Sequence, residues 1–71
     1  MNKTTHGTDI IARAINTKLD YKVVLLRKTN KAGEIRHYVS VIDHKTGKAL
    51  RFPSVAGIAP AFAKFKAMAN A

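Results

Sequence analysis

The middle of the chain alternates between stretches of strand character and turns, and this alternation limits the folds open to it. Residues 21–28 and 35–42 are rich in apolar and β-branched side chains, which are typical of strands. Residues 29–34 and 43–48 supply the Asn, Asp and Gly that turns require. Consecutive strands joined by short turns pair as hairpins, so the pattern predicts an antiparallel meander.

The second of these turns carries the most specific local signal. Its sequence, Asp-His-Lys-Thr-Gly-Lys at 43–48, suits a type I turn followed by Gly47 in the left-handed region, as in a bulged hairpin. A short third strand is then predicted at 49–52. Pro53 ends it, because proline lacks the N–H that a strand needs for pairing.

Helices are predicted before and after the strands in the sequence. Thr8 suits an N-cap, and the apolar residues that follow it fall on one stripe of a helix at 9–19; these are Ile10, Ile11, Ala14, Ile15 and Leu19. Residues 59–70 are rich in Ala, with Phe62 and Phe65 at helical spacing and Pro60 near the start. We therefore predict a two-layer α+β domain over 8–71, with an N-terminal helix, a three-stranded antiparallel meander and a C-terminal helix, preceded by a flexible segment at 1–7.

Length and composition set further bounds. A chain of 71 residues without cysteine allows one small domain and excludes disulfides as a source of stability. Residues 1–7 lack the apolar stretch of a signal peptide, and no apolar run approaches the length of a membrane span. These features predict an intracellular, cytoplasmic protein, with the nucleoid as one candidate location.

The charge balance points to a partner. Thirteen Lys and Arg residues face four Asp and Glu, giving a formal net charge of +9. Solubility alone needs less, and the excess costs self-repulsion in the folded state. DNA, RNA, anionic lipid and acidic proteins are the partners that such a charge favours, and a merely soluble basic protein is the alternative.

Most of the positive excess lies between residues 21 and 52, so the sheet and its turns are the predicted binding surface. Arg and Lys neutralise phosphates, Arg and Ser also bond base edges, and Tyr stacks on unpaired bases. We predict a non-catalytic nucleic-acid-binding protein, with DNA favoured over RNA. The candidate binding residues are Lys22, Arg27, Lys28, Lys31, Arg36, Tyr38, Ser40, Lys45, Lys48 and Arg51.

From about residue 25 onward the predicted layout resembles the arm-type DNA-binding domains of tyrosine recombinases. The resemblance rests on Arg36-His37-Tyr38 in the second strand, the turn at 43–48 and the Ala-rich final helix. It implies a three-stranded sheet that enters the major groove of DNA, with these residues as readers and phosphate contacts: Arg27, Arg36, Tyr38, Lys45, Lys48 and Arg51. The predicted N-terminal helix has no counterpart in that family, and without a catalytic domain the chain is not expected to be a recombinase itself.

Other functions are weighed against this one. The His, Ser and Asp residues form no recognised catalytic or metal-binding pattern, so we expect no enzyme activity, cofactor or metal. In the first predicted strand Val23 and Leu25 point one way and Val24 and Leu26 the other. One pair therefore either faces away from the helices or is buried beneath the chain termini or the N-terminal helix. An uncovered apolar pair beside basic residues would suit a homodimer or an acidic protein partner, which makes an inhibitor or accessory subunit the alternative function.

Overall fold

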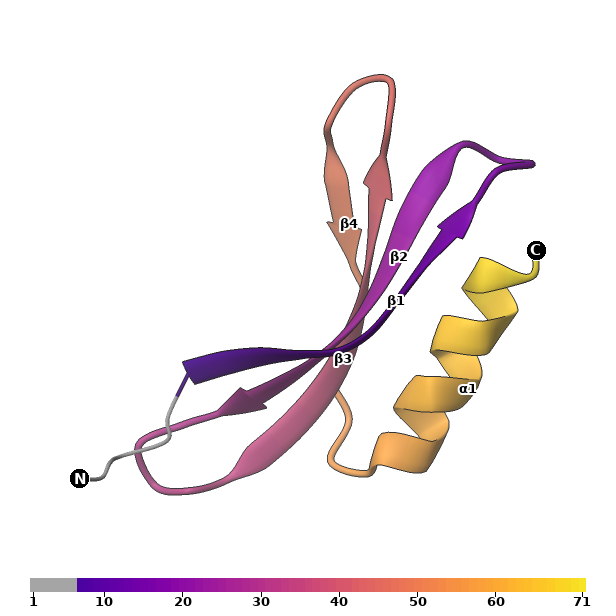
Figure 1. Cartoon of the computed structure of the whole chain (residues 1–71). Coiled ribbons are helices and arrows are strands. Elements are labelled where there is room, and N and C mark those ends of the chain that lie inside the picture. Colours follow the sequence, from indigo (N-terminus) through magenta and orange to yellow (C-terminus); the bar gives the residue numbers. More distant parts are fainter. Residues whose placement is uncertain (1–6) are drawn as a thin grey trace.

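A computed structural model describes residues 7–71 of the chain. Four strands form one antiparallel sheet in the order β1-β2-β3-β4, and a single helix follows them (Figure 1). The bounds are Gly7–Asn16 for β1, Tyr21–Thr29 for β2, Ile35–Asp43 for β3, Ala49–Arg51 for β4 and Ile58–Ala69 for α1. The strands β2, β3 and β4 and the helix α1 coincide closely with elements that the sequence predicts. Except for Gly7, the predicted flexible segment 1–7 lies outside the described residues.

The prediction of an N-terminal helix at 9–19, and with it the α+β fold class with two helices, is wrong. Residues 9–16 of this segment belong to β1, which pairs along its length with β2, and residues 17–19 lie in the turn that follows, so the sheet has four strands and one covering helix. The pairing register shifts between Ile10 and Ala12, so Ile11 is an extra residue in the strand. Such a bulge interrupts the two-residue alternation of a strand, and the interrupted pattern resembles the spacing of a helix.

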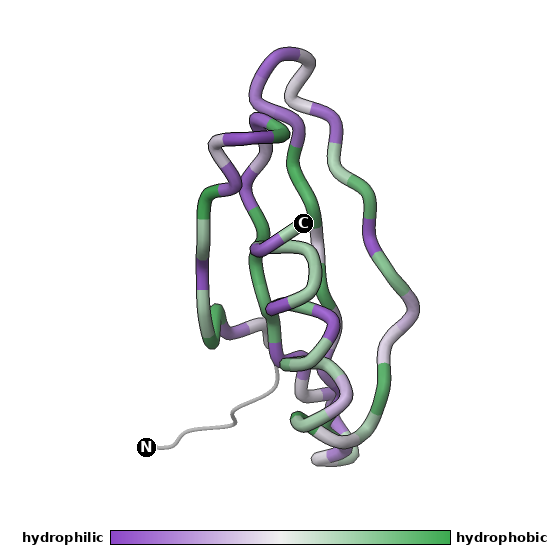
Figure 2. The backbone as a smooth tube through the Cα atoms, turned by 90° about the vertical axis from the view of Figure 1, so that its right-hand side faces the viewer, coloured by the Kyte–Doolittle hydropathy of each residue, from purple (hydrophilic) through white to green (hydrophobic). Residues whose placement is uncertain are grey.

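One face of the sheet packs against α1 and holds the core. Val23, Leu25 and Val39 of the two central strands are fully buried there and meet Ala61 and Phe65 of the helix. Hydrophobic residues accordingly follow the strand segments behind α1, whereas hydrophilic residues concentrate in the turns (Figure 2).

The strand β1 contributes Ile11 and two small side chains to this core. Ala12 and Ala14 lie opposite Leu25 and Val23 of β2 and contact the buried cluster. The sheet face that α1 does not cover is the open face, and among residues 7–71 no helix or second sheet covers it (Figure 1).

The C-terminal end of α1 is bonded to the first hairpin. Asn16 is 4% exposed, and its Nδ2 donates to the carbonyl oxygens of Met68 at 3.1 Å and Ala71 at 3.2 Å. The Tyr21 hydroxyl donates to the same Met68 oxygen at 2.7 Å. The last carbonyls of a helix lack partners within the helix, so these donors supply the missing hydrogen bonds of Met68, while the bond to Ala71 holds the residues after the helix.

The turn between β3 and β4 has the geometry that its sequence predicts. The N–H of Gly47 donates to the carbonyl of Asp43 at 2.8 Å, and the N–H of Asp43 donates to the carbonyl of Lys48 at 2.9 Å. Gly47 has φ +75°, in the left-handed region that favours glycine. The Asp43 carboxylate also accepts from the N–H of Lys45 at 2.7 Å, as in an Asx turn.

Candidate nucleic-acid interface

The open face gathers basic side chains from all four strands. Cross-strand pairing places Arg13 opposite Val24, Lys22 opposite Ile42, Lys28 opposite Arg36, and Ser40 opposite Arg51, and paired residues point to the same face. The strand register thus places five cations on this face: Arg13 of β1, Lys22 and Lys28 of β2, Arg36 of β3, and Arg51 of β4.

Carboxylates do not neutralise these cations. Asp9 lies opposite Arg27 and Asp43 opposite Tyr21, both on the helix-covered face, and Asp20 lies in a turn. Glu34 lines the same hollow as Lys28 and Arg36 but pairs with neither of them, and its Oε1 accepts from Asn30 Nδ2 at 2.8 Å. Within residues 7–71 no Lys or Arg pairs with a carboxylate, and the Asp20 Oδ1 instead lies 3.1 Å from His44 Nδ1.

The centre of the open face is a shallow hollow of about 300 Å³. Its floor is largely apolar and its rim is basic. The lining residues are Ile10, Arg13, Lys22, Val24, Leu26, Tyr38, Ser40, Ile42 and Arg51.

Although no backbone element covers this face, its central residues are buried. Val24 is 6% exposed, and Tyr38 and Ser40 are each 9% exposed. The Arg51 guanidinium carbon lies 5.1 Å from the centre of the Tyr38 ring, a cation–π contact that covers the ring. The long side chains of the rim therefore shield the floor while their charged groups remain in contact with solvent.

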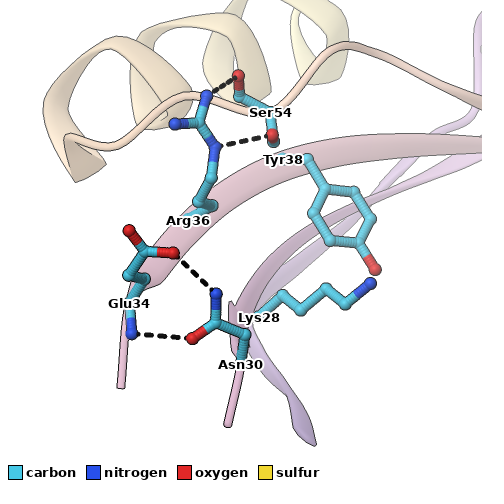
Figure 3. A pocket seen from close by; sticks show the side chains of 6 residues that line it. All are labelled: Lys28, Asn30, Glu34, Arg36, Tyr38 and Ser54. Atoms are coloured by element: carbon cyan, nitrogen blue, oxygen red, sulfur yellow. Dashed lines mark hydrogen bonds between the residues drawn. The ribbon is translucent and has the colours of Figure 1, made fainter. Parts of the chain in front are cut away.

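Arg36 is held in place by the segment after β4. Its Nε donates to the Ser54 hydroxyl at 2.8 Å, and its Nη2 donates to the Ser54 carbonyl at 2.7 Å (Figure 3). In the same view the Lys28 side chain extends toward the hydroxyl end of Tyr38. Arg36 and Lys28 line one further hollow, of about 250 Å³, at this end of the face. Because two neutral oxygens fix the guanidinium, its charge stays available to an anion.

The structure brings together six of the ten predicted binding residues. These six share the open face: Lys22, Lys28, Arg36, Tyr38, Ser40 and Arg51. Lys31 lies in the turn between β2 and β3, and Lys45 and Lys48 lie in the turn between β3 and β4, at the opposite end of the sheet (Figure 1). The turn lysines are exposed, but they flank the open face instead of lying on it.

Arg27 lies on the other face, away from the six. It sits opposite His37 and Asp9 on the helix-covered face, and its Nε is buried without a hydrogen-bond partner among residues 7–71. Conversely, sequence reasoning missed Arg13, because the segment around it was predicted as a helix. The alternation of Ala12, Arg13 and Ala14 is the sequence signal that separates Arg13 from the two alanines and places it on the other face of a strand.

Comparisons with protein-family models, with curated proteins and with solved structures find no match to this chain. No helix in the described part of the chain is long and apolar enough to cross a membrane. The interpretation of the open face therefore depends on its own geometry and charge.

Proposed function

We propose that the protein binds nucleic acid on the open face of its sheet and does so without catalysis. The observation that supports this most directly is the set of five cations, one or two from each strand, on a face whose strand positions carry no carboxylate. Lys and Arg that contact phosphates displace condensed counterions, which makes such binding favourable and strongly dependent on salt. DNA remains the favoured ligand, and an intracellular, cytoplasmic location is proposed with it.

The fourth strand changes how this proposal relates to the recombinase arm-type domains. In that resemblance a three-stranded sheet enters the major groove, whereas here β1 extends the sheet and contributes Arg13. The recombinase-like layout is therefore retained only as a proposal for β2, β3, β4 and α1. The basic face itself supports binding of a polyanion independently of that resemblance.

The test is a fluorescence anisotropy titration with labelled DNA at several salt concentrations. Arg13→Ala should weaken binding and lower the slope of log affinity against log salt by about 0.7 to 0.9, which corresponds to one phosphate contact. Arg27→Ala removes the same charge from the opposite face and is the matched control, with a smaller effect on the slope. Equal slope changes for both variants would show that net charge, and not the open face, determines binding.

Two further results would favour the alternative function, docking on an acidic protein partner. The purified protein would not bind DNA or RNA at low salt, and a pull-down after nuclease treatment would recover one stoichiometric partner protein. Together these results would replace the proposed function by that alternative.

A further inference from the structure

We infer that the open face selects single-stranded over double-stranded nucleic acid, with unpaired bases lying against Arg51 and the apolar floor. This inference rests on the proposed function and specifies its ligand. It follows from three features of the face: its width, its apolar floor and the stacked pair of Arg51 and Tyr38.

The width of the sheet is unfavourable for a duplex. The major groove of B-DNA is about 12 Å wide and admits a helix or a two-stranded ribbon. Neighbouring strands lie about 4.8 Å apart, so the backbones of four strands span about 14 Å before side chains are counted. Arg13 of β1 and Arg51 of β4 lie on opposite outer strands of this sheet. Both cannot follow the central strands into one groove.

The floor of the face is suited to bases. Between the cations lie apolar side chains from three strands, of which Leu26 and Ile42 are partly exposed and Ile10 is 57% exposed. A duplex presents phosphates and sugars on its outer surface, so it would leave this floor empty. A single strand can direct its bases to the floor and its phosphates to the basic rim.

Arg51 is the candidate platform for a base. Its guanidinium lies over the Tyr38 ring at 5.1 Å, and the residue is exposed. A guanidinium plane stacks on nucleic-acid bases as aromatic rings do. With Tyr38 buried beneath it, the ring supports the platform and does not meet the base directly, which changes the stacking role that the sequence predicts for this residue.

The two ends of the face can hold phosphates. Lys22 and Lys28 are six residues apart on β2, a distance of about 20 Å at the rise of a strand. Arg13 lies near the first of these lysines and Arg36 opposite the second. A strand that crosses the face along β2 would thus meet cations at both ends and the Arg51–Tyr38 pair between them.

The experiment compares four ligands of equal length and label by anisotropy at one salt concentration: a single DNA strand, its duplex, an abasic single strand, and an RNA strand of the same sequence. The single DNA strand should bind at least about ten-fold more tightly than both the duplex and the abasic strand, because one stacked base contributes a factor of this order. RNA binding as tight as or tighter than DNA also supports the inference, provided that it exceeds abasic binding.

A charge-conserving variant tests the platform. Arg51→Lys should lower affinity for the intact single strand several-fold and leave affinity for the abasic strand unchanged, since only the planar group is lost. Arg27→Lys on the opposite face is the control, and circular dichroism checks that each variant is folded.

The outcomes separate this inference from the proposed function. Equal affinity for intact and abasic strands, or duplex binding as tight as single-strand binding, overturns the inference and leaves nucleic-acid binding standing. Failure to bind any of the four ligands at low salt overturns both.

Discussion

The hydrogen bonds between Asn16 and the end of α1 give a specific prediction for stability. In Asn16→Ala, the Met68 and Ala71 carbonyl oxygens lose the Nδ2 donor at 3.1 and 3.2 Å, and the Leu19 N–H loses its acceptor at 2.9 Å. A net hydrogen bond contributes about 1 kcal/mol, but the bonds are not fully additive here. Met68 keeps the Tyr21 hydroxyl, and Leu19 is exposed to water. We therefore expect a loss of about 2 kcal/mol in the free energy of unfolding.

For a domain of this size, a loss of about 2 kcal/mol lowers the melting temperature by roughly 8–16 °C. Thermal and urea unfolding followed by circular dichroism measure it. Asn70→Ala is the matched control, because Asn70 is exposed and donates only its backbone N–H to Lys66, and it should cost less than about 0.5 kcal/mol.

A second variant tests the chemistry of the contact. Asn16→Asp keeps the shape of the side chain but replaces the donor by an oxygen that faces the two carbonyls, so it should be more destabilising than Asn16→Ala near neutral pH. If Asn16→Ala were as stable as Asn70→Ala, or if Asn16→Asp were harmless, the bonds to the helix end would not contribute to folding as argued.

Three further predictions concern the core, a turn and the interface. Phe65→Ala should cost about 3–4 kcal/mol, because Phe65 is 7% exposed in the only helix of the described fold, and urea denaturation should show a free energy of unfolding reduced by that amount. Gly47→Ala should cost about 1 kcal/mol through its φ of +75°, whereas little or no change in the urea midpoint would contradict the need for a left-handed residue there. Ser54→Ala leaves every charge in place but frees Arg36 Nε, so DNA affinity should fall a few-fold at constant salt slope; an altered slope would indicate a lost phosphate contact instead.

The local signals of the sequence account for β2, β3, β4 and α1. Their turns carry Asp, Asn and Gly at the required positions, and the Phe62–Phe65 spacing of the helix is typical of an amphipathic segment. The strand β1 could not be predicted in the same way. Its bulge puts the neighbours Ile11 and Ala12 both against the core, which breaks the two-residue alternation, and the four-residue spacing of Ile11 and Ile15 then imitates a helical stripe.

The candidate site is likewise predictable where it depends on strand alternation and not where it depends on tertiary contacts. Alternation along β2 and β3 predicts that Lys22, Lys28 and Arg36 share a face, and the structure places them together. The same alternation assigns Arg27 to the side of Val23 and Leu25, so the period of the strand separates Arg27 from the other predicted binding residues. The contact between Arg36 and Ser54 depends on tertiary structure after Pro53, which no local pattern contains.

The bulge in β1 also affects whether this edge strand can pair with another chain. A long strand with free N–H and C=O groups along its outer side invites another chain to pair with it, and repeated pairing leads to fibrils. An inserted residue spoils the spacing of those groups, and the exposed guanidinium of Arg13 opposes a second copy carrying the same charge. The other edge strand, β4, has only three residues and so offers little backbone for such pairing. The bulge that makes β1 hard to predict from the sequence thus also disfavours pairing of its edge with other copies of the protein.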